Sequence, residues 1–97
     1  MDKQVALSLL TDNIEDIRRR FSVKRIALFG SIARDDATDN SDVDVLVVFE
    51  QKAGFDVFME LKFHLEELLG TPVDLVTDKA LRPRLHKAIE QETINVA

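Results

Sequence analysis

Residues 28–47 read LFGSIARDDATDNSDVDVLV, two apolar stretches on either side of a short, mostly acidic connection. The first belongs to an apolar run over residues 23–29 that stops at Gly30, and the second belongs to a run over 43–49. Both runs are short, apolar and partly β-branched, which is typical of strands inside a sheet. The sequence therefore predicts two strands, joined by a helical turn and a loop over residues 32–41.

An amphipathic helix is predicted before this pair of strands. Residues 3–21 carry apolar side chains at helical spacing, and Asp2 is placed to cap the first turn. The residues expected to face the core are Val5, Leu9, Leu10, Ile14, Ile17 and Phe21.

A second long helix is predicted from Gly54 to about Leu69, with Gly70 in the position that commonly ends a helix. The residues expected to face the core are Phe55, Phe58, Leu61, Leu65 and Leu68. The rest of the chain predicts a strand over 72–77, a helix over 83–91 and a short edge strand at Ile94 and Val96. This order indicates an α+β fold in two layers, a small sheet with packed helices, in one domain over residues 1–97.

Composition narrows the classes of function. The chain has 97 residues, 45% hydrophobic and 32% charged, as expected of one globular domain. It contains no cysteine, which excludes disulfides, thiolate metal sites and a cysteine nucleophile. No apolar run reaches the ~20 residues that a membrane span needs, so we expect a cytoplasmic protein without a membrane partner. The net charge of −5 argues against extensive nucleic-acid binding.

Asp42 and Asp44 are the first candidate site residues. Residues two apart in a strand share a face and lie roughly 6.6 Å apart, so the two carboxylates are expected to point the same way. Two acids on one side of an apolar strand repel each other unless a cation lies between them. Mg²⁺ and Mn²⁺ prefer carboxylate oxygens and leave positions open for phosphate and water. Taken alone, an Asp-x-Asp pair is also typical of a solvated turn or a helix cap.

Gly30, Ser31 and Arg34 are candidate nucleotide-binding residues. Glycine allows a sharp turn and a close approach of the backbone to a ligand. Amides at the start of the following turn would point towards phosphate oxygens, and the Ser31 hydroxyl could add a contact. Ser31 could equally cap the turn, and Arg34 could form a structural ion pair rather than meet a phosphate.

The motif LFGSIAR followed by SDVDVLV resembles the signature of the polymerase-β-like nucleotidyltransferases, and the near-complete match is to their minimal form, the MNT proteins. The resemblance covers essentially the whole chain and implies the α+β nucleotidyltransferase core. It also implies a third carboxylate, Asp74, which with Asp42 and Asp44 would hold two metal ions and carry catalysis. Asp74 could instead pair with an arginine. Many relatives have glycine where this chain has Asp35, which leaves the loop geometry and the role of Arg34 open.

The resemblance further implies a function. MNT proteins are paired with HEPN-domain partners in prokaryotic toxin–antitoxin operons, so we expect transfer of AMP from ATP to a hydroxyl of a HEPN ribonuclease toxin. The chain contains no tyrosine, so a tyrosine acceptor would lie on another chain. Two alternatives remain: an antitoxin that acts by occlusion with an idle or regulatory nucleotide site, and a nucleic-acid polymerase or tRNA-modifying enzyme, which size and charge disfavour.

Three other features of the sequence each allow two interpretations. His64 and His86 are expected at the surface rather than as ligands. The cluster Lys79, Arg82, Arg84 and Lys87 fits a solvated face or a contact with an acidic partner or with phosphates. Met59 and Phe63 lie off the inward stripe of their helix, where they could complete the core or meet a partner.

Overall fold

The computed structural model describes residues 1–37, 42–80 and 93–96. The helices and strands in these ranges are α1 (Lys3–Phe21), β1 (Val23–Phe29), α2 (Gly30–Ala33), β2 (Val43–Phe49), α3 (Phe55–Leu69), β3 (Val73–Thr77), the 3₁₀ turn η1 (Asp78–Ala80) and β4 (Ile94–Asn95). These bounds agree with the predicted elements to within one or two residues at most ends. The helix predicted over 83–91 lies outside the described residues, and so do Arg82, Arg84, His86 and Lys87.

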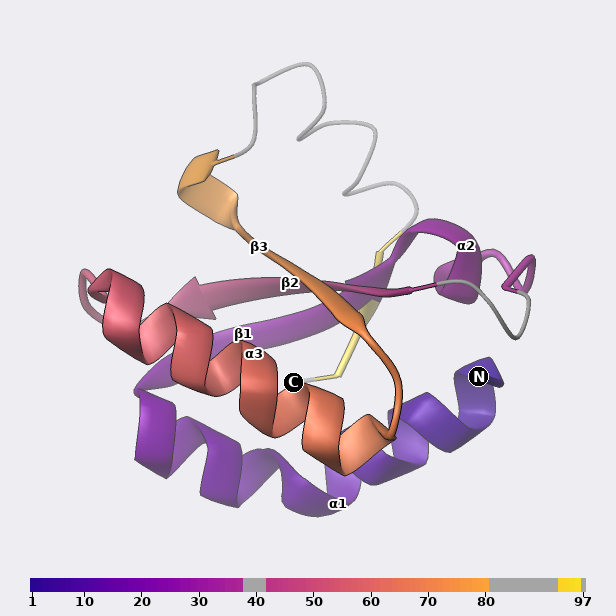
Figure 1. Cartoon of the computed structure of the whole chain (residues 1–97), viewed down its shortest axis with the longest axis horizontal. Coiled ribbons are helices and arrows are strands. Elements are labelled where there is room, and N and C mark those ends of the chain that lie inside the picture. Colours follow the sequence, from indigo (N-terminus) through magenta and orange to yellow (C-terminus); the bar gives the residue numbers. More distant parts are fainter. Residues whose placement is uncertain (38–41, 81–92, 97) are drawn as a thin grey trace.

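The four strands form one mixed sheet in the order β3-β2-β1-β4 (Figure 1). β1 pairs antiparallel with both β2 and β4, whereas β2 and β3 run parallel. A parallel pair needs a crossover connection, and α3 provides it. The strand predicted to be central, β2, does lie between two neighbours, and the edge strand predicted near Ile94 is confirmed.

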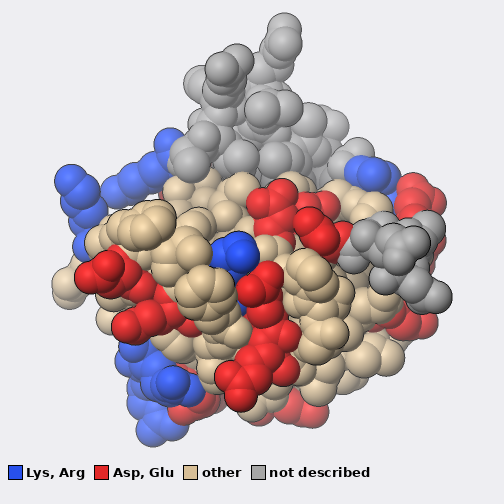
Figure 2. Space-filling view, in the orientation of Figure 1, with Lys and Arg blue, Asp and Glu red and all other residues tan. Residues whose placement is uncertain are grey.

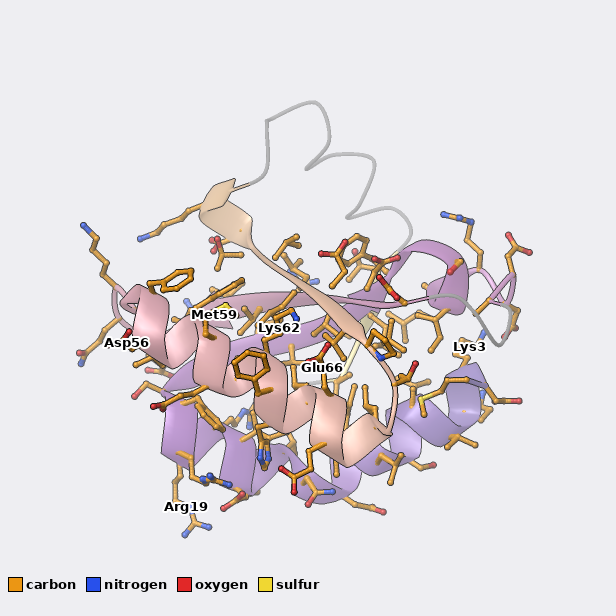
Figure 3. The ribbon with its side chains drawn as sticks, in the orientation of Figure 1. Lys3, Arg19, Asp56, Met59, Lys62 and Glu66 are labelled. Carbon is orange, nitrogen blue, oxygen red and sulfur yellow. The ribbon has the colours of Figure 1, made fainter. Side chains whose placement is uncertain are left out.

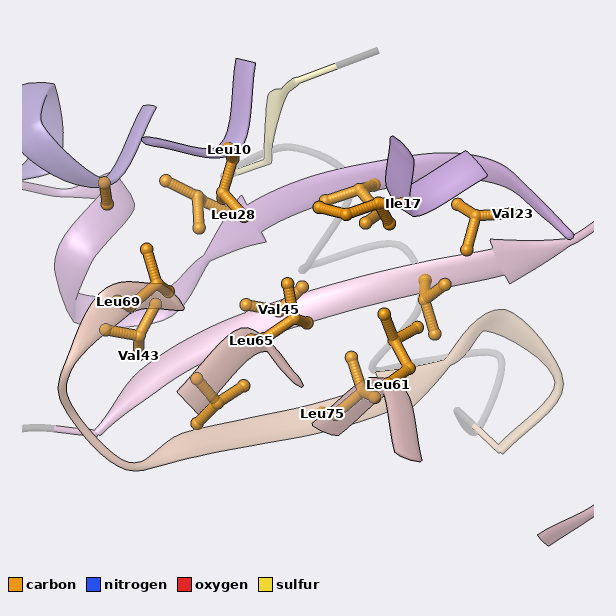
Figure 4. Packing of buried hydrophobic residues seen from close by; sticks show 14 of the residues in the cluster. Leu10, Ile17, Val23, Leu28, Val43, Val45, Leu61, Leu65, Leu69 and Leu75 are labelled. Carbon is orange, nitrogen blue, oxygen red and sulfur yellow. The ribbon is translucent and has the colours of Figure 1, made fainter. Parts of the chain in front are cut away.

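Helices α1 and α3 cover one face of the sheet and make the second layer (Figure 1). The core between the layers contains Leu10 and Ile17 from α1, together with Leu61 and Leu65 from α3 (Figure 4). Strand residues that face the helices complete it: Val23, Ile26, Leu28, Val43, Val45, Val47, Val73 and Leu75. Because side chains alternate across a strand, the intervening residues of β2 and β3 point to the opposite face.

Two residues expected in the core are exposed instead. Val5 is 49% exposed and Phe55 is 75% exposed. Both lie in the first turn of their helices, at an end of the helix. Helical periodicity predicts which face of a helix turns inward but not how far the helix extends past the sheet. Of the two residues left open, Phe63 is 57% exposed and Met59 is partly buried.

Local signals set the ends of the helices. The Gln4 amide donates to the Asp2 carboxylate at 2.6 Å, which confirms Asp2 as the cap of α1. Gly70 ends α3 with φ +69, a left-handed conformation that costs glycine little. Arg18, Arg19 and Arg20 occupy the last turn of α1, where cations meet the negative end of the helix dipole.

Charge is unevenly spread over the surface, as Figure 2 shows for one face. Within the ranges that the structure describes, no helix is both long enough and apolar enough to span a membrane.

Candidate active site

Asp44 and Asp74 lie side by side near the start of two neighbouring strands, each as the second residue of its strand. β2 and β3 run parallel, and their register places Asp44 directly opposite Asp74. Neighbouring strands are about 4.8 Å apart, so the two side chains leave adjacent backbones on the same face of the sheet. That face is opposite to the one covered by α1 and α3, because Val43, Val45, Val73 and Leu75 belong to the core between the layers.

The electrostatics of Asp44 follow from this placement. Burial raises the pKa of the Asp44 carboxyl above its usual range, and the negative charge of Asp74 and a hydrogen bond to its carboxyl group raise it further. The charge of Asp42 acts in the same direction more weakly, whereas the Arg34 guanidinium lowers the pKa. The Asp44 carboxylate therefore binds a proton more tightly than a free aspartate does.

Asp42 stands apart from this pair. β2 begins at Val43, so Asp42 precedes the strand, and its side chain is exposed. The amide of Val43 donates to the carbonyl of Pro72 at 3.0 Å, which joins the starts of β2 and β3 just beside Asp42. Asp42 thus lies at the entrance of the site, close enough for its charge to affect Asp44.

Gly30 completes the other side of the site. It follows β1 with φ +72, and Phe29, the residue before it, is the register partner of Asp44. A Cβ atom at position 30 would overlap the Oδ2 atom of Asp44. Glycine is therefore required here both for the backbone turn and for the space that the Asp44 carboxylate occupies.

Ser31 lies in the first turn of α2 and is half-buried. Phe29 occupies the N-cap position of α2, and no side chain caps this helix. Ser31 therefore does not cap the turn that follows β1. Within the described residues its hydroxyl has no hydrogen-bond partner, and first-turn amides lack partners inside a helix.

Arg34 ends α2 and pairs with Asp36, with 3.3 Å between Nε and Oδ2. Its side chain is about half exposed, and its charge still lowers the pKa of Asp44. Arg34 thus forms an ion pair within the protein, as one of the two interpretations of the sequence predicted. Its guanidinium also lies close enough to Asp44 to affect that carboxylate. Asp35, where the family resemblance implies glycine in many members, has φ +62. Aspartate is one of the few residues that tolerate this conformation, so the loop keeps a turn suited to glycine.

Asp44 and Asp74 together provide part of a binding site for a hard divalent cation. Two carboxylates in register, one with a raised pKa, form an arrangement that Mg²⁺ or Mn²⁺ relieves by supplying positive charge. Across residues 1–37, 42–80 and 93–96, no three acidic or histidine side chains converge as a complete metal site. The protein therefore offers a two-carboxylate nucleus with Asp42 beside it, and phosphate oxygens would supply further ligands.

Glu66 helps to position Asp74, a role that the sequence did not predict. Its carboxylate on α3 accepts a hydrogen bond from the Val73 amide at 2.9 Å and from Lys62 at 3.3 Å, both at Oε2. The Val73 bond is the main reason that the pKa of Glu66 lies below its usual range. Figure 3 shows Lys62 and Glu66 on the same side of α3. Glu66 thus fixes the start of β3 one residue before Asp74.

A second contact that the sequence did not predict holds the loop after α2 against α1. Lys3 on α1 forms an ion pair with Asp35 at 3.0 Å. Neither contact could be found from spacing, because each joins residues of different elements. His64 is partly buried and packs against the Phe21 ring at a centroid distance of 5.4 Å.

Comparisons with known proteins identify the family of the chain. Residues 11–96 match the family described as "Nucleotidyltransferase domain". The chain is 42% identical over 89 residues to "Protein adenylyltransferase MntA" of Thermococcus cleftensis, covering 92% of this chain and 90% of that protein. Among solved structures, one described as "putative minimal nucleotidyltransferase" superposes with a TM-score of 0.83 and 36% identity over 97% of this chain and 95% of the other.

A third match shows the fold alone. The complex of a tri-AMPylated HEPN toxin of Shewanella oneidensis with its MNT antitoxin contains a chain that matches with a TM-score of 0.68 and 22% identity. That match covers 94% of this chain and 71% of the other. The mixed sheet with helices on one face is the fold expected from the sequence motif. The chain belongs to the nucleotidyltransferase domain family, and its fold is that of the minimal nucleotidyltransferases.

Proposed function

We propose that this protein transfers AMP from ATP to a hydroxyl group of a HEPN-domain toxin and acts as the antitoxin to it. The observation that carries the proposal is the register of Asp44 and Asp74 on the face of the sheet opposite α1 and α3, with Gly30 leaving space for the Asp44 carboxylate. The Thermococcus relative is named a protein adenylyltransferase, which supports AMP as the transferred group. The AMPylated toxin in the Shewanella complex supports a HEPN toxin as the acceptor. We expect the reaction in the cytoplasm, where ATP is available.

In this proposal, Asp42, Asp44 and Asp74 hold two Mg²⁺ or Mn²⁺ ions. Bound ions supply positive charge to the triphosphate and to the attacking and leaving oxygens. Because the pKa of Asp44 is raised, protons would compete with a cation for this carboxylate. Asp74, held in place by the bond between Glu66 and the Val73 amide, serves the attacking side.

Gly30 and Ser31 bind the phosphates through backbone amides and the Ser31 hydroxyl, and Arg34 adds positive charge nearby. The acceptor oxygen forms a bond to the α-phosphorus, and the bond from that phosphorus to the bridging oxygen of the β-phosphate breaks. Pyrophosphate leaves, and the hydroxyl proton passes to water. The described part of this chain holds one sheet and its covering helices, so positioning of the acceptor falls to the second protein.

The second candidate function is occlusion without catalysis. One observation favours it: the acidic side chains of the described residues do not form a complete metal site. An antitoxin of this kind would silence its toxin by covering it, and the nucleotide site would be idle or regulatory.

Labelled ATP separates the two functions. The HEPN-domain partner, Mg²⁺ and α-labelled ATP should give a mass gain of one AMP on the partner, with release of pyrophosphate. Asp74→Asn should abolish the transfer and retain much of the ATP binding. If the Asp42→Asn, Asp44→Asn and Asp74→Asn variants silence the partner as well as the wild type, with no label transferred, occlusion is correct and the enzymatic proposal is wrong.

A further inference from the structure

An apolar groove lies at the far end of the strands that carry the acidic pair. Its volume is about 360 Å³, and its lining comes from the ends of β2 and β3 and from the start of α3. Val48, Phe49, Phe55 and Phe58 provide the apolar part of this lining. We call this feature the Phe55 groove.

The Phe55 side chain is the strongest sign that the groove binds something. It is 75% exposed, the highest value among the large hydrophobic residues described, although it belongs to a helix whose other face forms the core. Large aromatic side chains at protein surfaces are enriched in protein–protein interfaces. Phe58 is partly buried against the core, so a ligand of Phe55 would extend the hydrophobic core outward.

The rim of the groove carries positive charge in a protein that is acidic overall. Lys52 and Lys79 both line it, and neither forms an ion pair with any residue in the described ranges. Asp78 is the one acidic residue in the lining, so the rim carries a net positive charge while the chain carries −5. An apolar interior with unpaired lysines fits a protein segment that presents an apolar side chain flanked by carboxylates.

The position of the groove relative to the acidic pair limits what it can do. Val48 follows Asp44 by four residues on β2, and Thr77 follows Asp74 by three residues on β3. At about 3.3 Å per residue, the groove lies roughly 10–13 Å from the carboxylates. A segment bound there leaves the nucleotide site free, and an acceptor hydroxyl on the same partner can still reach it.

We propose that the Phe55 groove docks an apolar segment, flanked by acidic residues, of the HEPN-domain partner and so holds the acceptor near the nucleotide site. This proposal rests on the proposed function for the identity of the partner. It assigns the affinity for the partner to residues that take no part in the chemistry.

The test measures binding of the HEPN-domain protein by calorimetry, with the full chain and its variants. Phe55→Asp should weaken binding by about tenfold or more, because an exposed aromatic anchor is the type of residue that dominates an interface. Lys52→Glu combined with Lys79→Glu should also weaken binding and reduce its sensitivity to salt. Phe63→Asp is the matched control, because Phe63 is an exposed phenylalanine of the same helix outside the groove. It should change the affinity by less than about twofold.

Further measurements distinguish a failure of the docking proposal from a failure of the proposed function. All variants should bind ATP as the wild type does and melt within a few degrees of it, since Phe55 is exposed. If Phe55→Asp binds the partner as tightly as Phe63→Asp does, the docking proposal is wrong, and AMP transfer remains open to its own test. If binding depends on Phe55 but no AMP is transferred, docking stands and the proposed function fails. If the wild type alone sediments as a dimer and Phe55→Asp as a monomer, the groove binds a second copy, which overturns the proposal.

Discussion

Gly30 lies so close to Asp44 that a methyl group on its α-carbon would overlap the Asp44 carboxylate. The relationship joins the end of β1 to the start of β2 and explains why the motif needs glycine independently of any ligand. The same residue has φ +72, so two separate constraints act at one position.

Gly30→Ala should therefore destabilise the protein by more than backbone strain alone. The left-handed conformation costs an L-residue roughly 1–2 kcal/mol, and displacement of the Asp44 side chain adds to this. Gly70→Ala is the control, because Gly70 has φ +69 and nothing lies within 4 Å of the added Cβ. Urea denaturation should show a larger loss for Gly30→Ala than for Gly70→Ala. Equal losses would mean that the contact with Asp44 is unimportant.

Asp44→Asn should change how stability depends on pH in the presence of a chelator. The pKa of Asp44 is raised above its ordinary value of 3.8 in the folded protein, so the folded state binds the proton more tightly than the unfolded state. The associated stability is fully present below pH 3.8 and is lost as the pH rises through the folded-state pKa. Wild type should therefore lose stability relative to Asp44→Asn over this window.

Mg²⁺ should reverse the order or narrow the gap, because only the wild type gains from binding the ion at this pair. Thermal melts at several pH values, with chelator and with Mg²⁺, measure both effects. A wild type that is more stable than Asp44→Asn at neutral pH in chelator would show that the carboxylate serves as a structural acceptor instead.

Glu66→Gln should show the opposite dependence on pH. The pKa of Glu66 is lowered below its ordinary value of 4.5, chiefly by the Val73 amide. Its contribution to stability is present above pH 4.5 and is lost as the pH falls through the folded-state pKa. The advantage of wild type over Glu66→Gln in urea melts should therefore shrink as the solution is acidified.

Glu67→Gln provides the comparison, because the adjacent Glu67 is exposed on the same helix. Its stability should follow that of the wild type across the pH range. Glu66→Ala should cost more than Glu66→Gln, since an amide oxygen can still accept from Val73 and a methyl group cannot. If the two substitutions behave alike, the Val73 bond does not hold β3 in place.

Asp35 gives a test of the loop after α2. Its φ of +62 is strained for most residues, so Asp35→Ala should destabilise the protein relative to Asp35→Gly by about 1 kcal/mol or more. Both variants lose the ion pair with Lys3, so their difference isolates the backbone. Asp36→Ala compared with Asp36→Gly should show no such preference for glycine, because Asp36 does not have positive φ. Chemical denaturation of the four variants measures the preference.

Much of the fold could be predicted from the sequence because its signals are local. The Asp2 cap, the end of α3 at Gly70 and the bounds of β1 and β2 depend on residues within a few positions of each other. The exposure of Val5 and Phe55 could not be predicted, because it depends on where the helices lie relative to the sheet.

In the site, too, local features could be predicted from the sequence and contacts between elements could not. The sequence identified Gly30 and the two acids at the start of β2 from their spacing, and Asp74 through the family resemblance. The register that places Asp44 opposite Asp74 depends on a crossover through α3, and spacing along the chain does not reveal it. The bond from Val73 to Glu66 likewise depends on how α3 packs beside β3.

Calorimetric titration of ATP tests the central claim most directly, namely that the carboxylates at positions 44 and 74 form a metal-dependent nucleotide site. Wild type should bind ATP in Mg²⁺ or Mn²⁺ and should lose this binding in chelator, and Asp44→Asn should fail to bind in either condition. The affinity is expected to be weak, because we expect the base and the ribose to be poorly enclosed without the second protein. Equal affinity for ATP in chelator and in Mg²⁺, or unchanged binding by Asp44→Asn, would contradict the account.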